Sequence, residues 1–113
     1  MKQYGRTLNL KDDPELIRRY VKYHRRVWPE VERGLRAIGI KRMLIFLHGR
    51  SLFMSLETVD GFDPKRDFAR FEASSPKVRH WQELMATLQE PIAEAKAGEW
   101  WADMKLVYSL KPR

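Results

Sequence analysis

The sequence predicts an α+β fold of the ferredoxin-like type, with the element order βαββαβ and helices on one face of an antiparallel sheet. Three observations predict it. The chain has 113 residues, which suits a single domain over residues 1–113. Strand-like stretches occur near both ends and as a pair in the middle. Two regions of helical periodicity lie between them.

The first strand and helix are predicted from residues 4–39. Residues 4–10 alternate and place Arg6 on the same face as Leu8 and Leu10. Asp13 can cap a helix that has Pro14 at its first position, and Gly39 should end it. The expected apolar stripe of this helix consists of Leu16, Tyr20, Tyr23, His24, Val27, Trp28, Val31, Leu35 and Ile38. Pro29 removes one backbone hydrogen bond and should kink the helix or divide it in two.

Residues 41–48 and 51–58 are predicted to form two strands joined tightly at Gly49-Arg50. Residues 42–47 are apolar on both faces, unlike a strand with one side in water. A chain this short has helices for only one face of its sheet. The other face should therefore meet a second copy, which predicts a homodimer, a dimeric α+β barrel.

The remaining elements complete the predicted order. Residues 65–71 should form a short helix, and a second helix should start at Ser75-Pro76 and continue to Leu88. Residues 93–99 are expected to be a turn or loop. Residues 104–110 alternate again and are predicted to form the last strand.

Composition narrows the functional class. Cysteine is absent, so disulfides and cysteine metal sites are impossible, and a reducing, cytoplasmic location fits. We expect no signal peptide and no membrane span. The net charge is +7, and basic residues are dense along the first helix. A nucleic-acid-binding surface is one interpretation, but interspersed glutamates favour a solvated helix face.

His24 is the candidate acid/base, because an imidazole exchanges protons near neutral pH. Tyr20, His24 and Trp28 are spaced four residues apart and would form one column on a continuous helix. The alternative for His24 is a packed core residue with satisfied nitrogens. His48 and His80 are expected at the surface, and His80 is also a candidate for the rim of the site. The three histidines lack the spacing of a metal-ligand set, so no metal is expected.

Other candidate site residues are aromatic or charged. Trp81 and the pair Trp100-Trp101 offer flat surfaces for a sugar, although tryptophan also serves as core. Neighbouring tryptophans cannot point the same way, so we expect one of the pair to pack and the other to cover a pocket. Arg6, on an apolar strand face, should pair with a carboxylate, bind a ligand or reach solvent.

At these residues the sequence resembles the L-rhamnose mutarotase family, which includes L-fucose mutarotases. The resemblance covers nearly the whole chain and is carried by the string from Tyr20 through His24 and Trp28 to Pro29-Glu30, by the Arg79-His80-Trp81 segment, and by Leu106-Val107-Tyr108. It implies a ferredoxin-like fold that dimerises through its sheets. The implied activity is interconversion of the α and β anomers of a deoxy sugar without metal or organic cofactor.

The resemblance also assigns residues. His24 corresponds to the family's proton donor, Tyr20 to a substrate-binding tyrosine, and Trp81 to one of two adjacent substrate-binding tryptophans. This chain has Met43 where the family has a second binding tyrosine, and His80 where it has the first tryptophan. The proton donor is thus retained while sugar-contacting residues differ, which leaves room for L-fucose beside L-rhamnose.

The sequence therefore predicts an isomerase: a homodimeric aldose mutarotase with His24 as acid/base and a pocket shaped by Tyr20, Trp81, Trp28 and Arg6, with Met43 and His80 as substrate-binding candidates. Two rival interpretations stay open. A cofactor-free monooxygenase of the dimeric α+β barrel kind would consume oxygen. A basic nucleic-acid-binding module would bind in a salt-sensitive way. We expect neither nucleic acid nor membrane as a partner.

Overall fold

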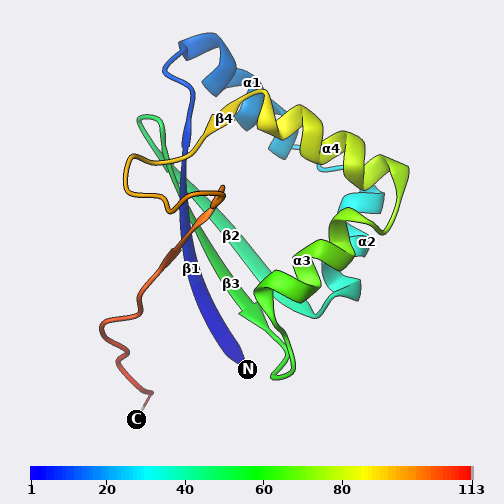
Figure 1. Ribbon diagram of the computed structural model, residues 1–113, viewed down its shortest axis with the longest axis vertical. Helices are drawn as coiled ribbons and strands as arrows, with labels where there is room; N and C mark the ends of the chain where they lie inside the picture. Colours follow the sequence, from blue (N-terminus) through cyan, green and yellow to red (C-terminus); the bar gives the residue numbers. More distant parts are fainter. Residues whose placement is uncertain (113) are drawn as a thin grey trace.

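A computed structural model describes residues 1–112 and contains the predicted layers (Figure 1). Its elements are β1 (Lys2–Leu10), α1 (Pro14–His24), α2 (Pro29–Ala37), β2 (Ile40–His48), β3 (Ser51–Thr58), α3 (Pro64–Glu72), α4 (Pro76–Ala86), β4 (Gln89–Glu90) and β5 (Ala102–Met104). The strands form one antiparallel sheet in the order β2-β3-β1-β4, and β5 also pairs with β1. The α+β, ferredoxin-like prediction is confirmed.

The helices begin where the sequence placed capping residues. The Asp13 side chain accepts a hydrogen bond from the Glu15 amide, Asp63 from the Arg66 amide and Ser75 from the Val78 amide. A proline follows each cap, where its missing N–H is not needed. These local signals explain why the starts of three helices were predictable.

Pro29 divides the predicted long helix in two. Helix α1 ends at His24, and α2 begins at Pro29 with Trp28 as its N-cap. The column of Tyr20, His24 and Trp28 on one continuous helix is therefore a wrong prediction, since Trp28 lies outside α1. The break leaves His24 at a helix end.

All four helices lie on one side of the sheet, as Figure 1 shows. The inner face of the sheet supplies buried residues to the core, among them Leu8, Leu10, Leu52 and Leu56. The outer face is polar in places, but Leu44, Phe46 and Phe53 are exposed on it, and the Phe46 and Phe53 rings stack at 6.1 Å between centroids. The predicted bare apolar face is confirmed.

The predicted last strand is wrong. Pairing with β1 covers only Ala102–Met104, and residues 105–112 leave the sheet without strand structure (Figure 1). The alternation over residues 104–110 is real, but Leu106, Val107, Tyr108 and Leu110 are largely exposed. Alternation predicts strand geometry only where a neighbouring strand is present to pair with. The short strand β4 was not predicted, because two residues carry no periodicity.

Candidate active site

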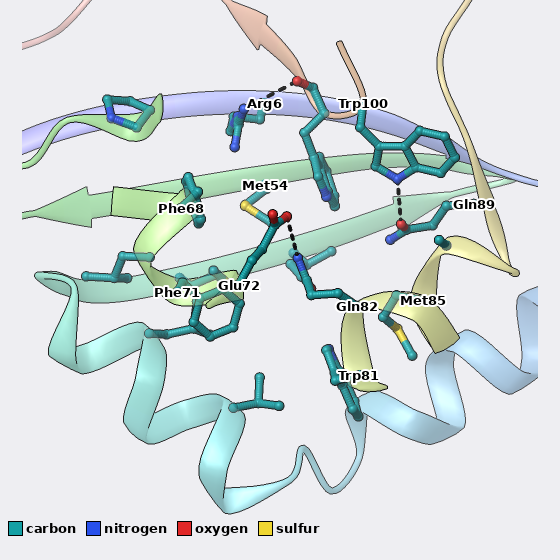
Figure 2. Close-up of a pocket in the computed structure, with 18 of the residues that line it drawn as sticks. Arg6, Met54, Phe68, Phe71, Glu72, Trp81, Gln82, Met85, Gln89 and Trp100 are labelled. Carbon is teal, nitrogen blue, oxygen red and sulfur yellow. Dashed lines mark hydrogen bonds between the residues drawn. The ribbon is translucent and has the colours of Figure 1, made fainter. Parts of the chain in front are cut away.

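A cavity of about 1390 Å³ lies between the inner face of the sheet and the helices (Figure 2). Small-molecule pockets usually measure about 300–1,000 Å³, so one monosaccharide has ample room. The lining combines apolar side chains such as Met54, Phe68 and Met85 with a few polar ones, including Arg6 and Gln89. That mixture suits a ligand with both C–H faces and hydroxyl groups.

His24 lines this cavity from the end of α1. Its Nδ1 lies 2.8 Å from the carbonyl oxygen of Tyr20. A carbonyl oxygen only accepts hydrogen bonds, so the neutral ring carries its hydrogen on Nδ1 and a lone pair on Nε2. Burial lowers the pKa of His24 from its usual 6.5, and the hydrogen bond to Tyr20 partly opposes that change. The neutral, basic form is therefore favoured near pH 7.

A second, smaller cavity also borders α1. It measures about 460 Å³ and is lined by Tyr20, His24 and apolar residues of β2 and β3. His24 thus lines both cavities. Open space beside the ring is what the acid/base interpretation of His24 requires.

Tyr20 lies one turn before His24, and its side chain is buried. The two rings are 4.2 Å apart between centroids. Burial raises the pKa of the Tyr20 hydroxyl to about 12, against a smaller opposite effect of a hydrogen bond with Gln89. The hydroxyl therefore stays protonated at every physiological pH and acts as a hydrogen-bonding group.

Trp81 is buried at the centre of an aromatic cluster. Its ring meets that of His24 edge to face at 5.5 Å, and the rings of Tyr23 and Trp28 at 6.1 Å and 5.1 Å. Trp81 also lines the large cavity, where Figure 2 shows it near the α1–α2 connection. The cluster fixes the indole and, through it, one side of the imidazole.

Trp28 and His80 are not among the residues that line either cavity. Their rings contact each other at 5.3 Å, and Trp28 packs against Trp81. His80 is exposed on α4, and the Lys77 ammonium group lies 5.4 Å from the centre of the Trp28 ring. The structure therefore places these two predicted site residues outside the cavity, behind Trp81.

Met43 and Arg6 do line the cavity. Met43 projects from β2 toward the helices and is half-buried. The Arg6 guanidinium donates from Nε to the Asp103 carboxylate at 3.0 Å and lies 5.0 Å above the Phe68 ring. The carboxylate pairing expected for Arg6 is present, while its cavity-facing position also allows contact with a ligand.

Sequence reasoning missed several polar residues that border the cavity, among them Gln89, Glu72 and Gln82. Figure 2 shows Gln82 from α4 facing Glu72 from α3, and the Gln82 amide nitrogen donates to the Glu72 carboxylate at 3.5 Å. Gln89 lies on β4, which the sequence did not predict. No local pattern marks these residues, because helix packing alone brings them together.

The basic face of α1 is a solvated surface. Arg18, Arg19, Lys22 and Arg25 are exposed, and Arg18 and Arg19 form ion pairs with Glu15. Within residues 1–112, no group of three or more His, Cys, Asp or Glu side chains could hold a metal ion. None of the helices in the same residues is both long and apolar enough to cross a bilayer.

The sequence comparisons assign the family. The family model for L-rhamnose mutarotase matches residues 3–110. A UPF0734 protein of Dictyostelium discoideum is 47% identical over 112 residues, covering 96% of this chain and 90% of the relative. An L-fucose mutarotase of Xanthomonas campestris is 34% identical over 105 residues, covering 91% of this chain and 83% of the relative.

The chain belongs to the L-rhamnose mutarotase family. It is thus a carbohydrate isomerase of the mutarotase class, which interconverts sugar anomers, and the predicted enzyme class is confirmed.

Solved structures confirm the fold. The L-rhamnose mutarotase of Formosa agariphila superposes with a TM-score of 0.71 at 16% identity, over 98% of this chain and all of that one. Tetracenomycin F2 cyclase of Streptomyces glaucescens superposes with a TM-score of 0.60 at 15% identity, and each chain is covered fully. A polyketide cyclase and a mutarotase share this fold, so the fold alone does not select the chemistry.

Proposed function

We propose that this chain interconverts the α and β anomers of a 6-deoxy sugar, L-fucose or L-rhamnose, with His24 as the general acid/base. The observation that supports it best is the geometry of His24. Its Nδ1 is held by the Tyr20 carbonyl, and the ring borders a cavity large enough for a monosaccharide.

The proposed chemistry needs one proton to leave the anomeric hydroxyl and one to reach the ring oxygen. The C1–O5 bond breaks, and the anomeric oxygen becomes the aldehyde carbonyl. After rotation about C1–C2, the O5 hydroxyl attacks the other carbonyl face, and the proton transfers run in reverse. The free Nε2 of neutral His24 accepts the proton of the anomeric hydroxyl and delivers it to O5 as the C1–O5 bond breaks. During closure it takes the proton of the O5 hydroxyl and returns it to the anomeric oxygen.

The remaining site assignments are also proposals. Tyr20 and Trp81 are the proposed substrate-binding residues closest to His24, and Met43 and Arg6 border the same cavity. Trp28 supports Trp81 from behind. For His80, which is exposed and outside the cavity lining, no sugar contact is proposed.

The test is anomer exchange by saturation-transfer NMR, with L-rhamnose and L-fucose measured in parallel. His24→Gln keeps a polar side chain of similar length but cannot exchange protons. It should lower the exchange rate on the order of 10²–10⁴-fold. His48→Gln is the matched control, since His48 is exposed at the end of β2. Exchange by His24→Gln at the wild-type rate would contradict the proposal.

We also propose that two copies pair through the outer face of the sheet. Phe46 and Phe53 are 56% and 40% exposed there, although large apolar side chains normally avoid water. Met104 of β5 is exposed beside Gly5 of β1, and Leu106, Val107, Tyr108 and Leu110 of the following segment are also largely exposed. A second copy would bury these groups. The proposed compartment is the cytoplasm, on the cysteine-free composition.

A further inference from the structure

The acidic side chains that border the large cavity are Glu32, Glu72, Glu99 and Asp103. All but Glu72 have a role in the fold. Asp103 pairs with Arg6, and both carboxylate oxygens of Glu99 accept hydrogen bonds from backbone amides. Glu32 lies in the first turn of α2, where the helix dipole favours a carboxylate. Glu72 therefore needs a separate explanation.

The fold does not favour a carboxylate at Glu72. This residue is the last of α3, and the partial negative charge of a helix C-terminus opposes an acidic side chain there. Within residues 1–112, Glu72 forms no salt bridge. Its hydrogen bond from the Gln82 amide nitrogen is long, at 3.5 Å, and a bond of that length contributes little. The stability of the fold therefore does not explain this carboxylate at the cavity.

Glu72 and Gln82 border the same cavity as His24. Gln82 follows Trp81 on α4, and the Trp81 ring meets the His24 ring edge to face at 5.5 Å. Figure 2 shows the Glu72 and Gln82 side chains pointing toward each other from α3 and α4. A sugar whose anomeric carbon lies at His24 would therefore share its cavity with a carboxylate from a different helix.

The Glu72 carboxylate has hydrogen-bonding capacity to spare. An ionised carboxylate only accepts, and it has two oxygens with about four lone-pair sites. In the described part of the chain, the long bond from Gln82 uses one of these sites. Two neighbouring hydroxyl groups of a sugar ring provide two O–H donors side by side, and hydrogen bonds from hydroxyl groups to a carboxylate are strong. The side chain therefore matches a pair of sugar hydroxyl groups.

We propose that Glu72, beside Gln82, accepts hydrogen bonds from two neighbouring hydroxyl groups of the sugar ring, away from the anomeric carbon, and so determines which 6-deoxy sugar is preferred. This inference rests on the proposed function. L-Rhamnose and L-fucose differ in the orientation of their hydroxyl groups at C2 and C4, so a carboxylate at one place in the cavity binds one of them better. Met54 and Phe68, which border the same cavity, suit the C–H groups and the methyl group.

The first experiment measures sugar binding by NMR titration with L-rhamnose and L-fucose. Glu72→Ala removes the carboxylate at an exposed helix end, where alanine is well tolerated. We expect the Kd of the preferred sugar to rise roughly ten-fold or more, and the preference between the two sugars to shrink. Glu83→Ala is the matched control, because Glu83 is exposed on α4 and is not among the residues that line either cavity. An unchanged Kd in Glu72→Ala would overturn the inference.

A sugar analogue separates direct contact from a structural tie between α3 and α4. Any two neighbouring hydroxyl groups among C2, C3 and C4 include the one at C3, so the analogue is the 3-deoxy form of the preferred sugar. Its Kd should exceed that of the parent sugar roughly ten-fold in wild type, but less than about three-fold in Glu72→Ala. Equal ratios in the two proteins would overturn the inference.

These Kd values do not depend on proton transfer by His24. Exchange by His24→Gln at the wild-type rate would refute the proposed function and leave the Kd comparison intact, so the two failures are distinguishable.

Discussion

The Nδ1 atom of His24 and the backbone carbonyl oxygen of Tyr20 lie 2.8 Å apart across the last turn of α1. Tyr20 lies one turn before the end of α1, and its carbonyl oxygen accepts a hydrogen bond from the imidazole. The bond fixes the ring's tautomer and its orientation. A backbone carbonyl in the last turn of α1 thus orients this imidazole, as an acidic side chain orients many catalytic histidines.

The kcat/KM for anomer exchange should fall with decreasing pH only below pH 6.5. Burial lowers the pKa of His24 from 6.5, so the neutral base persists below that pH. The check is kcat/KM from NMR exchange between pH 4.5 and 8, in buffers that do not themselves catalyse mutarotation. An acid limb centred above pH 6.5 would contradict the assignment of His24.

The same change in pKa predicts a pH-dependent stability. The folded state binds a proton at His24 more weakly than the unfolded state, whose pKa is about 6.5. The contribution to stability is complete above pH 6.5 and declines as the pH falls from there toward the lower folded-state pKa. Urea unfolding measures the free energy of unfolding of both proteins. From pH 7.5 to pH 5.5, this free energy should fall more for wild type than for His24→Gln. If the free energies of unfolding of wild type and His24→Gln differ by the same amount at both pH values, the prediction is wrong.

Met43→Tyr should shift sugar preference toward L-rhamnose. Met43 borders the cavity, and the family resemblance places a substrate-binding tyrosine at this position. The measurement is the ratio of kcat/KM for L-rhamnose to that for L-fucose. His80→Trp is the matched control, because His80 is exposed outside the cavity lining and its replacement should leave the ratio unchanged. If His80→Trp changes this kcat/KM ratio more than Met43→Tyr does, the prediction is wrong.

Phe46→Glu should convert the proposed dimer to monomer. Phe46 is 56% exposed and stacks on Phe53 at the outer face, so a carboxylate there costs the isolated fold little but opposes burial against a second copy. Analytical ultracentrifugation measures the mass. Ala37→Glu, on an exposed position of α2, should keep the wild-type mass. A monomeric wild type at every concentration would refute the proposed pairing.

Gly39→Ala should destabilise the fold by about 1–3 kcal/mol. Gly39 has φ +102°, and an added Cβ would lie 2.6 Å from Val59 Cγ2. Gly61→Ala is the control, because an added Cβ there meets nothing within 4 Å and its φ is not positive. Chemical denaturation gives both free energies of unfolding. Equal stabilities for the two variants would show that neither the strain nor the contact matters.

Several features followed from local sequence. Asp13-Pro14 and Ser75-Pro76 determine helix starts because a cap and its proline act within one turn. Pro29 had to break the helix, since its ring and missing N–H act on the preceding turn. The apolar outer face was visible in residues 42–47, since two strand faces alternate in the sequence itself. His24 could be selected because it was the only histidine in an apolar stripe.

Tertiary structure decided the rest. Residues 104–110 have strand periodicity, yet a strand requires a partner. The segment that pairs with β1 is Ala102–Met104, so Met104 alone of the predicted range lies in a strand. Trp28 has the right spacing but faces Trp81 from outside the cavity because the chain turns between α1 and α2. Gln89 and Trp100 meet only when the segment between β4 and β5 folds over the cavity. Spacing along the chain determines what one helix or strand presents, whereas the directions of hydrogen bonds between distant residues exist only after packing.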